Sequence, residues 1–126
     1  MPRQIISTDR APKPAGAYSQ GVQWESLVFT AGQVAIDPAT GQPAPGGVRE
    51  QTRQVMQNVR AVLEGAGLDL GSVVKTTCFL ADINDFAAFN EVYREFFPSD
   101  PPARSTVQVG LVDPWVVEVE AIAVHP

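Results

Sequence analysis

Alternating apolar and polar residues predict a β-sheet whose strands lie toward both ends of the chain and in its middle. Strands are expected at residues 3–6, 22–24, 27–35, 73–81, 105–109 and 116–124. Two residues, Glu25 and Ser26, separate the second strand from the third, which predicts a tight hairpin. Gly32 interrupts the third strand, and a glycine there often marks a bulge or a close approach of the backbone to another group.

Two helices are predicted between these strands, at residues 48–66 and 86–97. The apolar residues of the first recur at helical spacing on one face: Val55, Val59, Val62, Leu63 and Ala66. Gly65 and Gly67 then end this helix. The second helix has an aromatic stripe that we interpret as core: Phe86, Phe89, Tyr93, Phe96 and Phe97. Its candidate N-caps are Asp82, Asn84 and Asp85. Pro98 ends it.

The order of these elements indicates one α+β domain over residues 1–126, with both helices on one face of a mixed sheet. The chain offers no further helix to cover the opposite face of the sheet. Another subunit is the natural cover, so a symmetric oligomer is predicted.

Composition narrows the classes of function. Apolar residues make up 44% of the chain and charged residues 18%, which is typical of a globular domain. The formal net charge of −5 argues against nucleic-acid binding, which a basic surface would favour. No segment has the roughly 20 apolar residues of a membrane span, and the first residues lack the apolar stretch of a signal peptide. We therefore expect a cytoplasmic protein without a membrane partner.

The sequence predicts neither a metal site nor a bound cofactor. Cys78 and His125 are the single cysteine and the single histidine, so the usual ligand clusters are missing. The segment 45–47 has neither the spacing nor the lysine of a phosphate-binding loop.

One face of the 73–81 strand carries four residues: Val74, Thr76, Cys78 and Leu80. Without a histidine partner, Cys78 is expected to be a small core residue rather than a nucleophile.

Arg104 is the first candidate for a binding residue. Pro101 and Pro102 cannot continue a helix and hold the chain extended, so Arg104 is expected where a loop leads into a strand, at the mouth of a cleft. A guanidinium presents a planar fork of donors that suits a carboxylate or a phosphate. From the residues alone, an ordinary surface arginine at a strand edge is the alternative.

Glu118 and Glu120 are two residues apart in the final strand and therefore lie on the same side of it. One interpretation is a solvent-facing pair. The other is that a subunit interface buries one of them, which would make it a candidate base or water-orienting group, because burying an unpaired carboxylate costs free energy. The spacing does not choose between the two glutamates.

Six segments, in order along the chain, match the pattern of one family: residues 17–21, 29–33, 82–86, 89–93, 102–105 and 119–124. Through these segments the chain resembles the Rid family, the reactive intermediate deaminases, which are also called YjgF-like proteins. The resemblance implies a chorismate-mutase-like fold, a homotrimer, and active clefts between neighbouring subunits.

The resemblance also implies an activity. Rid proteins hydrolyse 2-imino acids or their enamine tautomers, such as 2-iminobutanoate and 2-iminopropanoate, to 2-keto acids and ammonia. Arg104 matches the residue that binds the substrate carboxylate, and Glu120 matches the residue that holds or activates the attacking water. Tyr18 matches a tyrosine of the same cleft, and Asn90 matches an asparagine near it, for which an ordinary helix-surface amide is the alternative. Such a site must anchor the carboxylate, position one water and handle one proton, without a metal or a cofactor.

The backbone around Gly32 and Thr106 is expected to supply further polar contacts to the substrate. The chain departs from the family pattern at two positions of this site, with Ala31 where serine is common and Thr106 where cysteine is common. Ala31 lacks a hydroxyl that would bond substrate or water, whereas Thr106 keeps a hydroxyl and a carbonyl. These changes bear on substrate range and rate more than on the class of reaction.

Three other functions are alternatives to imine hydrolysis. A ribonuclease or translation inhibitor, an activity of some relatives, is opposed by the negative charge. A binding or holdase module would use the same clefts without catalysis, and the loss of serine at Ala31 favours it. A chorismate mutase is disfavoured, because a dianion calls for more than one cation in the cleft and Arg104 alone is convincingly placed.

Overall fold

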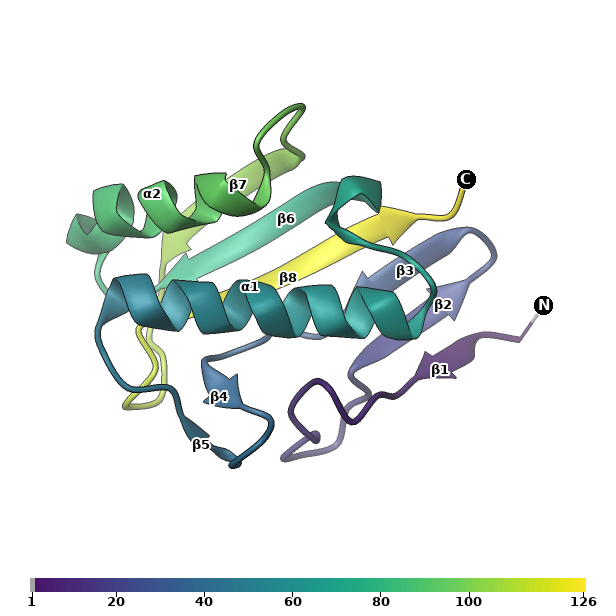
Figure 1. Ribbon diagram of the computed structural model, residues 1–126, viewed down its shortest axis with the longest axis horizontal. Helices are drawn as coiled ribbons and strands as arrows, with labels where there is room; N and C mark the ends of the chain where they lie inside the picture. Colours follow the sequence, from purple (N-terminus) through teal and green to yellow (C-terminus); the bar gives the residue numbers. More distant parts are fainter. Residues whose placement is uncertain (1) are drawn as a thin grey trace.

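The computed structural model describes residues 2–126 (Figure 1). Its main sheet has six strands in the order β1-β2-β3-β8-β6-β7. Their bounds are β1 Gln4–Ile6, β2 Gly21–Trp24, β3 Leu27–Thr30, β6 Val73–Leu80, β7 Ala103–Gln108 and β8 Val117–Val124. β6 and β7 pair in parallel and the other neighbours pair antiparallel, so the sheet is mixed, as predicted.

The two long helices, α1 (Val48–Gly65) and α2 (Phe86–Phe96), lie on one face of this sheet (Figure 1). α1 packs against β8 and β3 and runs beside α2. Within residues 2–126, no helix covers the opposite face. The predicted α+β class, with two helices on one face of a mixed sheet, is confirmed.

Shorter elements fill the connections. β4 (Ile36–Asp37) and β5 (Gln42–Pro43) form a two-stranded ribbon within the expected loop. The 3-10 turns η1 (Leu70–Ser72) and η2 (Ile83–Asp85) precede β6 and α2. The Asp82 side chain accepts a hydrogen bond from the Asn84 amide at 2.9 Å, and so it caps η2 rather than α2 itself.

The third strand is shorter than predicted. β3 ends at Thr30 instead of residue 35, and pairing with β8 resumes as an isolated bridge between Gln33 and Val119. In the gap, Thr30 Oγ1 accepts a hydrogen bond from the Ala121 amide at 3.0 Å and replaces a rung of the ladder. Gly32 lies in this interruption, as a glycine inside a strand often does.

The start of β6 also differs from prediction. The register against β8 shifts between Val73 and Lys75, which is a β-bulge. An extra residue in one strand reverses the alternation of faces before it. Val74 is consequently 49% exposed, and its predicted place on the face of Thr76 and Cys78 was wrong.

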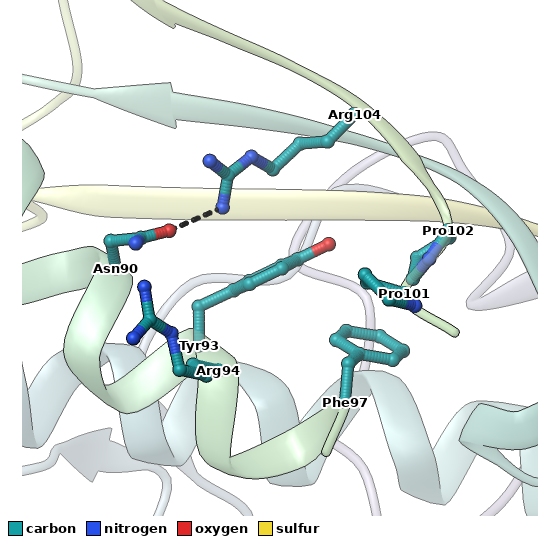
Figure 2. Close-up of a pocket in the computed structure, with 7 residues that line it drawn as sticks. All are labelled: Asn90, Tyr93, Arg94, Phe97, Pro101, Pro102 and Arg104. Carbon is teal, nitrogen blue, oxygen red and sulfur yellow. Dashed lines mark hydrogen bonds between the residues drawn. The ribbon is translucent and has the colours of Figure 1, made fainter. Parts of the chain in front are cut away.

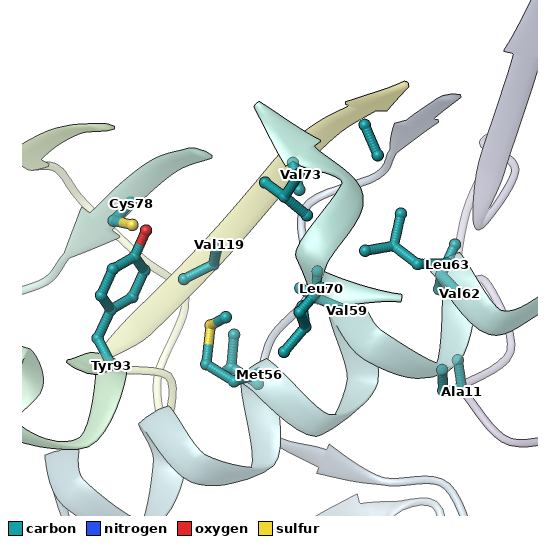
Figure 3. Close-up of a cluster of buried hydrophobic side chains, with 14 of the residues drawn as sticks. Ala11, Met56, Val59, Val62, Leu63, Leu70, Val73, Cys78, Tyr93 and Val119 are labelled. Carbon is teal, nitrogen blue, oxygen red and sulfur yellow. The ribbon is translucent and has the colours of Figure 1, made fainter. Parts of the chain in front are cut away.

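The core lies between α1 and the sheet (Figure 3). α1 contributes five side chains with no exposed surface: Val55, Met56, Val59, Val62 and Leu63. They meet buried side chains of β3 and β8: Val28, Val117, Val119, Ala121 and Ala123. Burial of a large aliphatic side chain contributes about 1.5–3 kcal/mol, so this layer dominates the stability of the domain.

Asn58 is a buried polar residue of α1 that fixes the chain after Gly32. Its Nδ2 donates to the carbonyl oxygens of Val34, at 3.0 Å, and Ile36, at 2.9 Å. Val34 lies in the irregular segment between β3 and β4, and Ile36 is the first residue of β4. The Val34 carbonyl also accepts a hydrogen bond from the Ile36 amide at 2.8 Å. Asn58 thereby holds this segment against the core.

We predict that Asn58→Ala lowers the free energy of unfolding by about 1–3 kcal/mol, because the Ile36 carbonyl loses its Asn58 donor and an unsatisfied buried group costs about 1–3 kcal/mol. Chemical denaturation would measure the change. Gln57→Ala, at the neighbouring exposed position of α1, is the control and should change stability by less than about 0.5 kcal/mol. Equal losses in the two variants would contradict the assigned role of Asn58.

Candidate functional site

Arg104 lies on the edge strand β7 and its side chain extends toward α2 (Figure 2). Its register partner on β6 is Thr76, a buried residue on the helix side of the sheet. Arg104 Nη1 donates a hydrogen bond to Asn90 Oδ1 at 2.8 Å. A guanidinium has five N–H donors, so most of the fork remains available to an anion.

Three aromatic rings of α2 support the guanidinium of Arg104. Its Cζ lies 4.7 Å from the ring centroid of Tyr93, 5.4 Å from that of Phe86 and 5.8 Å from that of Phe89. Cations are attracted to ring faces at such distances. The aromatic stripe, which the sequence predicted only as core, therefore also positions a charge.

Tyr93 is itself held in place by a hydrogen bond to the sheet. Its Oη and Thr76 Oγ1 are 2.7 Å apart in a buried hydrogen bond. Burial raises the pKa of the Tyr93 phenol, and the bond to Thr76 opposes that rise. The rings of Phe89 and Phe97 are tilted against that of Tyr93, with centroids 5.4 Å and 5.0 Å from it. The guanidinium consequently rests on a rigid surface.

A pocket of about 360 Å³ opens beside this surface, between α2 and the loop that leads into β7 (Figure 2). Its lining residues are Asn90, Tyr93, Arg94, Phe97, Pro101, Pro102 and Arg104. The structure thus brings Arg104 and Asn90 together, two of the residues expected at the site. The sequence patterns did not reveal Arg94, although it follows Asn90 by four residues and such pairs share one face of a helix.

Thr106 lies two residues beyond Arg104, on the same face of β7. Its Oγ1 is buried and has no hydrogen-bond partner in the part of the chain that the structure describes. An unpaired buried hydroxyl is costly, so a ligand that bonded to it would gain free energy. Its register partner Cys78 is fully buried, and burial raises the pKa of that thiol to about 11. Cys78 is therefore a core residue, as predicted, and not an activated nucleophile.

A second group of candidate residues surrounds Gly32. Tyr18 and Gly32 line a small recess of about 20 Å³, away from the Arg104 pocket. Tyr18 is 51% exposed, and its Oη accepts a hydrogen bond from the Ala15 amide at 3.2 Å. The Ala31 amide donates to the carbonyl oxygen of Gln20 at 2.8 Å, so this donor is already engaged.

Glu118 and Glu120 project from the face of β8 that the helices leave open. Glu120 is exposed, whereas Glu118 is half-buried and lies over Gly32. A Cβ atom on Gly32 would come within 2.1 Å of Glu118 Oε2, so the glycine makes room for the carboxylate. Burial raises the pKa of Glu118, and the charge of Glu120 raises it further.

Within one chain, Arg104 and Glu120 point to opposite faces of the sheet. Arg104 is in register with Thr76 and Glu120 with Thr77 on the same strand, β6. Adjacent residues of a strand face opposite sides. The expected site residues therefore form two groups, one around Arg104 and one around Gly32 and Glu120.

In the described range 2–126, no group of three or more His, Cys, Asp or Glu side chains is placed to hold a metal ion. None of the helices in that range has the length and apolarity needed to traverse a bilayer.

The fold and the arginine pocket define a small α+β domain with a candidate site for an anionic small molecule. Comparison with known proteins then identifies the family. The family model described as Endoribonuclease L-PSP matches residues 8–125, and the chain belongs to this family, which is the YjgF/RidA family. The resemblance drawn from the sequence is thereby confirmed.

Individual relatives agree with this assignment. A RutC family protein from Pyrococcus abyssi is 48% identical, and the match covers 98% of each chain. A 2-iminobutanoate/2-iminopropanoate deaminase from Rattus norvegicus is 46% identical over 98% of this chain and 90% of its own. The crystal structure of E. coli TdcF with bound serine matches with a TM-score of 0.93 and 46% identity, over 98% of this chain and 99% of that one.

We predict that Gly32→Ala displaces the Glu118 carboxylate with little loss of stability, below about 1 kcal/mol, because the group it meets is the flexible end of a side chain. As Glu118 moves toward solvent, its pKa should fall toward the ordinary value, which NMR titration would measure. Gly21→Ala is the contrast: its Cβ would lie 2.9 Å from Val62 Cγ1 and 3.1 Å from the Phe29 carbonyl, so overpacking should cost about 1–3 kcal/mol. Similar losses at both glycines would show that Glu118 cannot move.

Proposed function

We propose that the protein hydrolyses 2-imino acids to 2-keto acids and ammonia, with 2-iminobutanoate and 2-iminopropanoate as expected substrates. One observation carries the proposal: the guanidinium of Arg104 is held by Asn90 and by the ring of Tyr93, while most of its donors stay free at a pocket. A 2-imino acid offers such a fork a carboxylate directly beside the reactive carbon. The names of relatives such as the Rattus norvegicus deaminase support the same reaction.

Arg104 would bind the substrate carboxylate through two parallel hydrogen bonds. Its own hydrogen bond to Asn90 and its contact with Tyr93 fix the plane of the fork before substrate arrives. A preorganised anchor of this kind lowers the entropic cost of placing the imine carbon. The free hydroxyl of Thr106, on the same face of β7, is available for a further polar contact.

Glu120 would orient the attacking water and accept its proton. The water oxygen bonds to the imine carbon, the C=N double bond becomes a single bond, and the nitrogen takes up a proton to give a carbinolamine. Proton transfer from the new hydroxyl to the nitrogen then releases ammonia and forms the keto group. A positioned carboxylate typically contributes about 10²–10⁴-fold to such proton transfers.

Because Arg104 and Glu120 face opposite sides of the sheet in one chain, we infer that the complete site takes its two halves from different subunits. The open face carries exposed apolar side chains suited to an interface: Ile5, Trp24, Phe29 and Val107. We infer a homotrimer, as the family resemblance implies, in which the Glu120 face of one subunit closes the Arg104 pocket of the next. The recess of Tyr18 and Gly32 would accompany Glu120.

The matching family model is described as an endoribonuclease, so RNA cleavage is the second candidate activity. The net charge of −5 opposes it, since nucleic-acid affinity rests largely on contacts between cations and phosphates. RNA cleavage by nuclease-free protein that Arg104→Ala abolishes would establish it. Binding of a keto acid without imine turnover would instead support the non-catalytic function that Ala31 suggests.

We predict that Arg104→Lys lowers kcat/KM for imine hydrolysis by about 10- to 150-fold. Lysine keeps the charge but loses one of two charged hydrogen bonds, each worth about 1.5–3 kcal/mol. Arg104→Ala should lose more, because the carboxylate would enter the pocket without a partner. The assay follows keto-acid release from imine that a threonine dehydratase generates, with thermal melts of each variant to verify folding. Full activity in Arg104→Ala would place the chemistry elsewhere.

We predict that Arg104→Ala and Glu120→Gln proteins, each inactive alone, recover activity when they are mixed under conditions that exchange subunits. If each site takes Arg104 from one chain and Glu120 from another, every trimer that contains both variants has one intact site. When the two variants are mixed in equal amounts, about a quarter of all sites are then intact, so about a quarter of the parental activity should return. The double variant Arg104→Ala/Glu120→Gln mixed with the parent provides the reference for exchange. Recovery that stays at the level of the unmixed variants would contradict a shared site.

A further inference from the structure

We propose that Arg94 makes the Arg104 pocket a site for dianions, so that the protein accepts 2-imino acids that carry a second carboxylate. This inference rests on the proposed function, because it takes Arg104 as the contact of the first carboxylate. It adds a specificity-determining residue and a substrate class to that function.

The geometry places two guanidinium groups in one pocket. Arg94 and Arg104 both line it, the first from α2 and the second from β7 (Figure 2). Asn90, which accepts the hydrogen bond of Arg104, lies one helical turn before Arg94 on the same face of α2. Figure 2 shows the Asn90 amide at the end of the pocket where both guanidinium groups lie.

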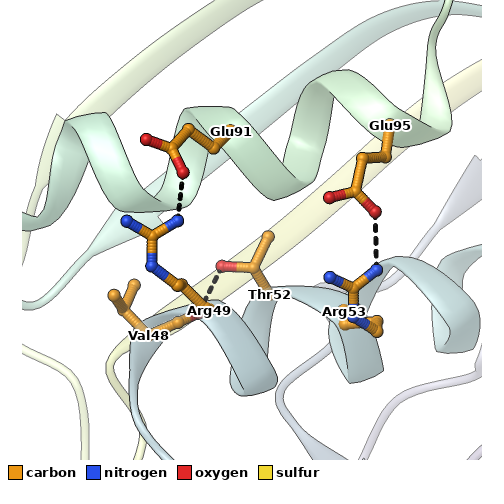
Figure 4. Close-up of polar contacts among 6 residues, drawn as sticks. All are labelled: Val48, Arg49, Thr52, Arg53, Glu91 and Glu95. Atoms are coloured by element: carbon orange, nitrogen blue, oxygen red, sulfur yellow. Dashed lines mark hydrogen bonds and ion pairs between the residues drawn. The ribbon is translucent and has the colours of Figure 1, made fainter.

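The acidic side chains of α2 do not neutralise this pair. Glu91 forms an ion pair with Arg49 of α1, and Glu95 forms one with Arg53 at 2.7 Å (Figure 4). Both glutamates therefore extend toward α1, away from the pocket. No acidic residue is among the lining residues, and neither Arg94 nor Arg104 forms an ion pair within residues 2–126. Asp100 lines a separate hollow that adjoins the pocket at Phe97 and Pro102.

Within residues 2–126, two cations without an ion-pair partner line one concave pocket, in a chain with a net charge of −5. The overall charge repels a dianion, so local cations decide whether it binds. A volume of about 360 Å³ lies within the range of small-molecule sites and suffices for a short dicarboxylate. From the sequence we recognised one placed cation, and the structure adds the second.

In a substrate of this class the first carboxylate adjoins the imine carbon and binds Arg104. The second carboxylate, two or three carbons away, would extend along the pocket toward Arg94. The reaction is unchanged: water adds to the imine carbon and ammonia leaves, while the second carboxylate takes no part. Arg94 would therefore act on affinity and not on the chemical step.

Calorimetric titration with two stable keto acids tests this inference, 2-oxoglutarate as the dicarboxylate and 2-oxobutanoate as the monocarboxylate. The parent protein should bind 2-oxoglutarate about 2- to 5-fold more tightly, which lies within the range that an exposed ion pair gives. Arg94→Gln should remove this advantage and leave 2-oxobutanoate within about twofold of the parent. Arg94→Lys should keep most of it, and raised salt should reduce it in the parent.

Arg60→Gln is the matched control. Arg60 belongs to α1, with its Cζ 5.2 Å from the ring centroid of Phe96, and it does not line the pocket. Its substitution removes the same charge from the protein and should leave the preference intact. Equal affinities of the parent for the two keto acids, or a preference that survives Arg94→Gln, would overturn the inference. If either result is found while 2-iminobutanoate is still hydrolysed, the inference on Arg94 fails and the proposed function stands. If the protein neither binds a keto acid nor hydrolyses the imine, the proposed function fails as well.

Discussion

The register of β7 against β6 is the constraint on which the site depends. It places Arg104 beside Thr76 and hence on the helix side, within reach of α2. A slip of one residue would turn Arg104 to the open face and bring Ser105 toward the helices. Contacts at the end of the strand hold the register: the Val109 amide donates to the Leu80 carbonyl at 3.0 Å, and the Ile83 amide donates to Gln108 Oε1 at 2.8 Å. The prolines before Arg104 limit the conformations of the chain that enters the strand.

The same register links the core to the pocket. Thr76 is bonded to Tyr93, the ring of Tyr93 lies under Arg104, and Arg104 is bonded to Asn90. Each contact joins the sheet to α2, so the packing that stabilises the helix also orients the guanidinium. Side chains locked by packing and by hydrogen bonds hold a binding group more accurately than a mobile loop would.

Local patterns predicted much of this structure. The helical spacing of Val55, Val59 and Val62 identified the buried face of α1, because such spacing depends on the chain segment alone. The bulge that exposes Val74 depends on how β6 meets β8, and no property of its own segment indicates it. Gly32 indicated an interruption in the third strand, but the residue at which β3 ends depends on the pairing with β8.

The candidate site was predictable in its parts and not in its arrangement. The family segments predicted Arg104 and Glu120 as site residues, but whether two strands direct such residues to one face depends on their register with a third strand. Arg94 gave no signal, because an arginine on an amphipathic helix is ordinary unless the pocket beside it is known. Its significance emerges only when Glu91 and Glu95 are seen to pair with α1 instead.

Under the proposed assembly, the arginine half of the site is ordered before subunits meet. Arg104 is already held by Asn90 and Tyr93, and Glu118 already lies over Gly32 within a single chain. Association then does not have to order the guanidinium, which lowers its entropic cost.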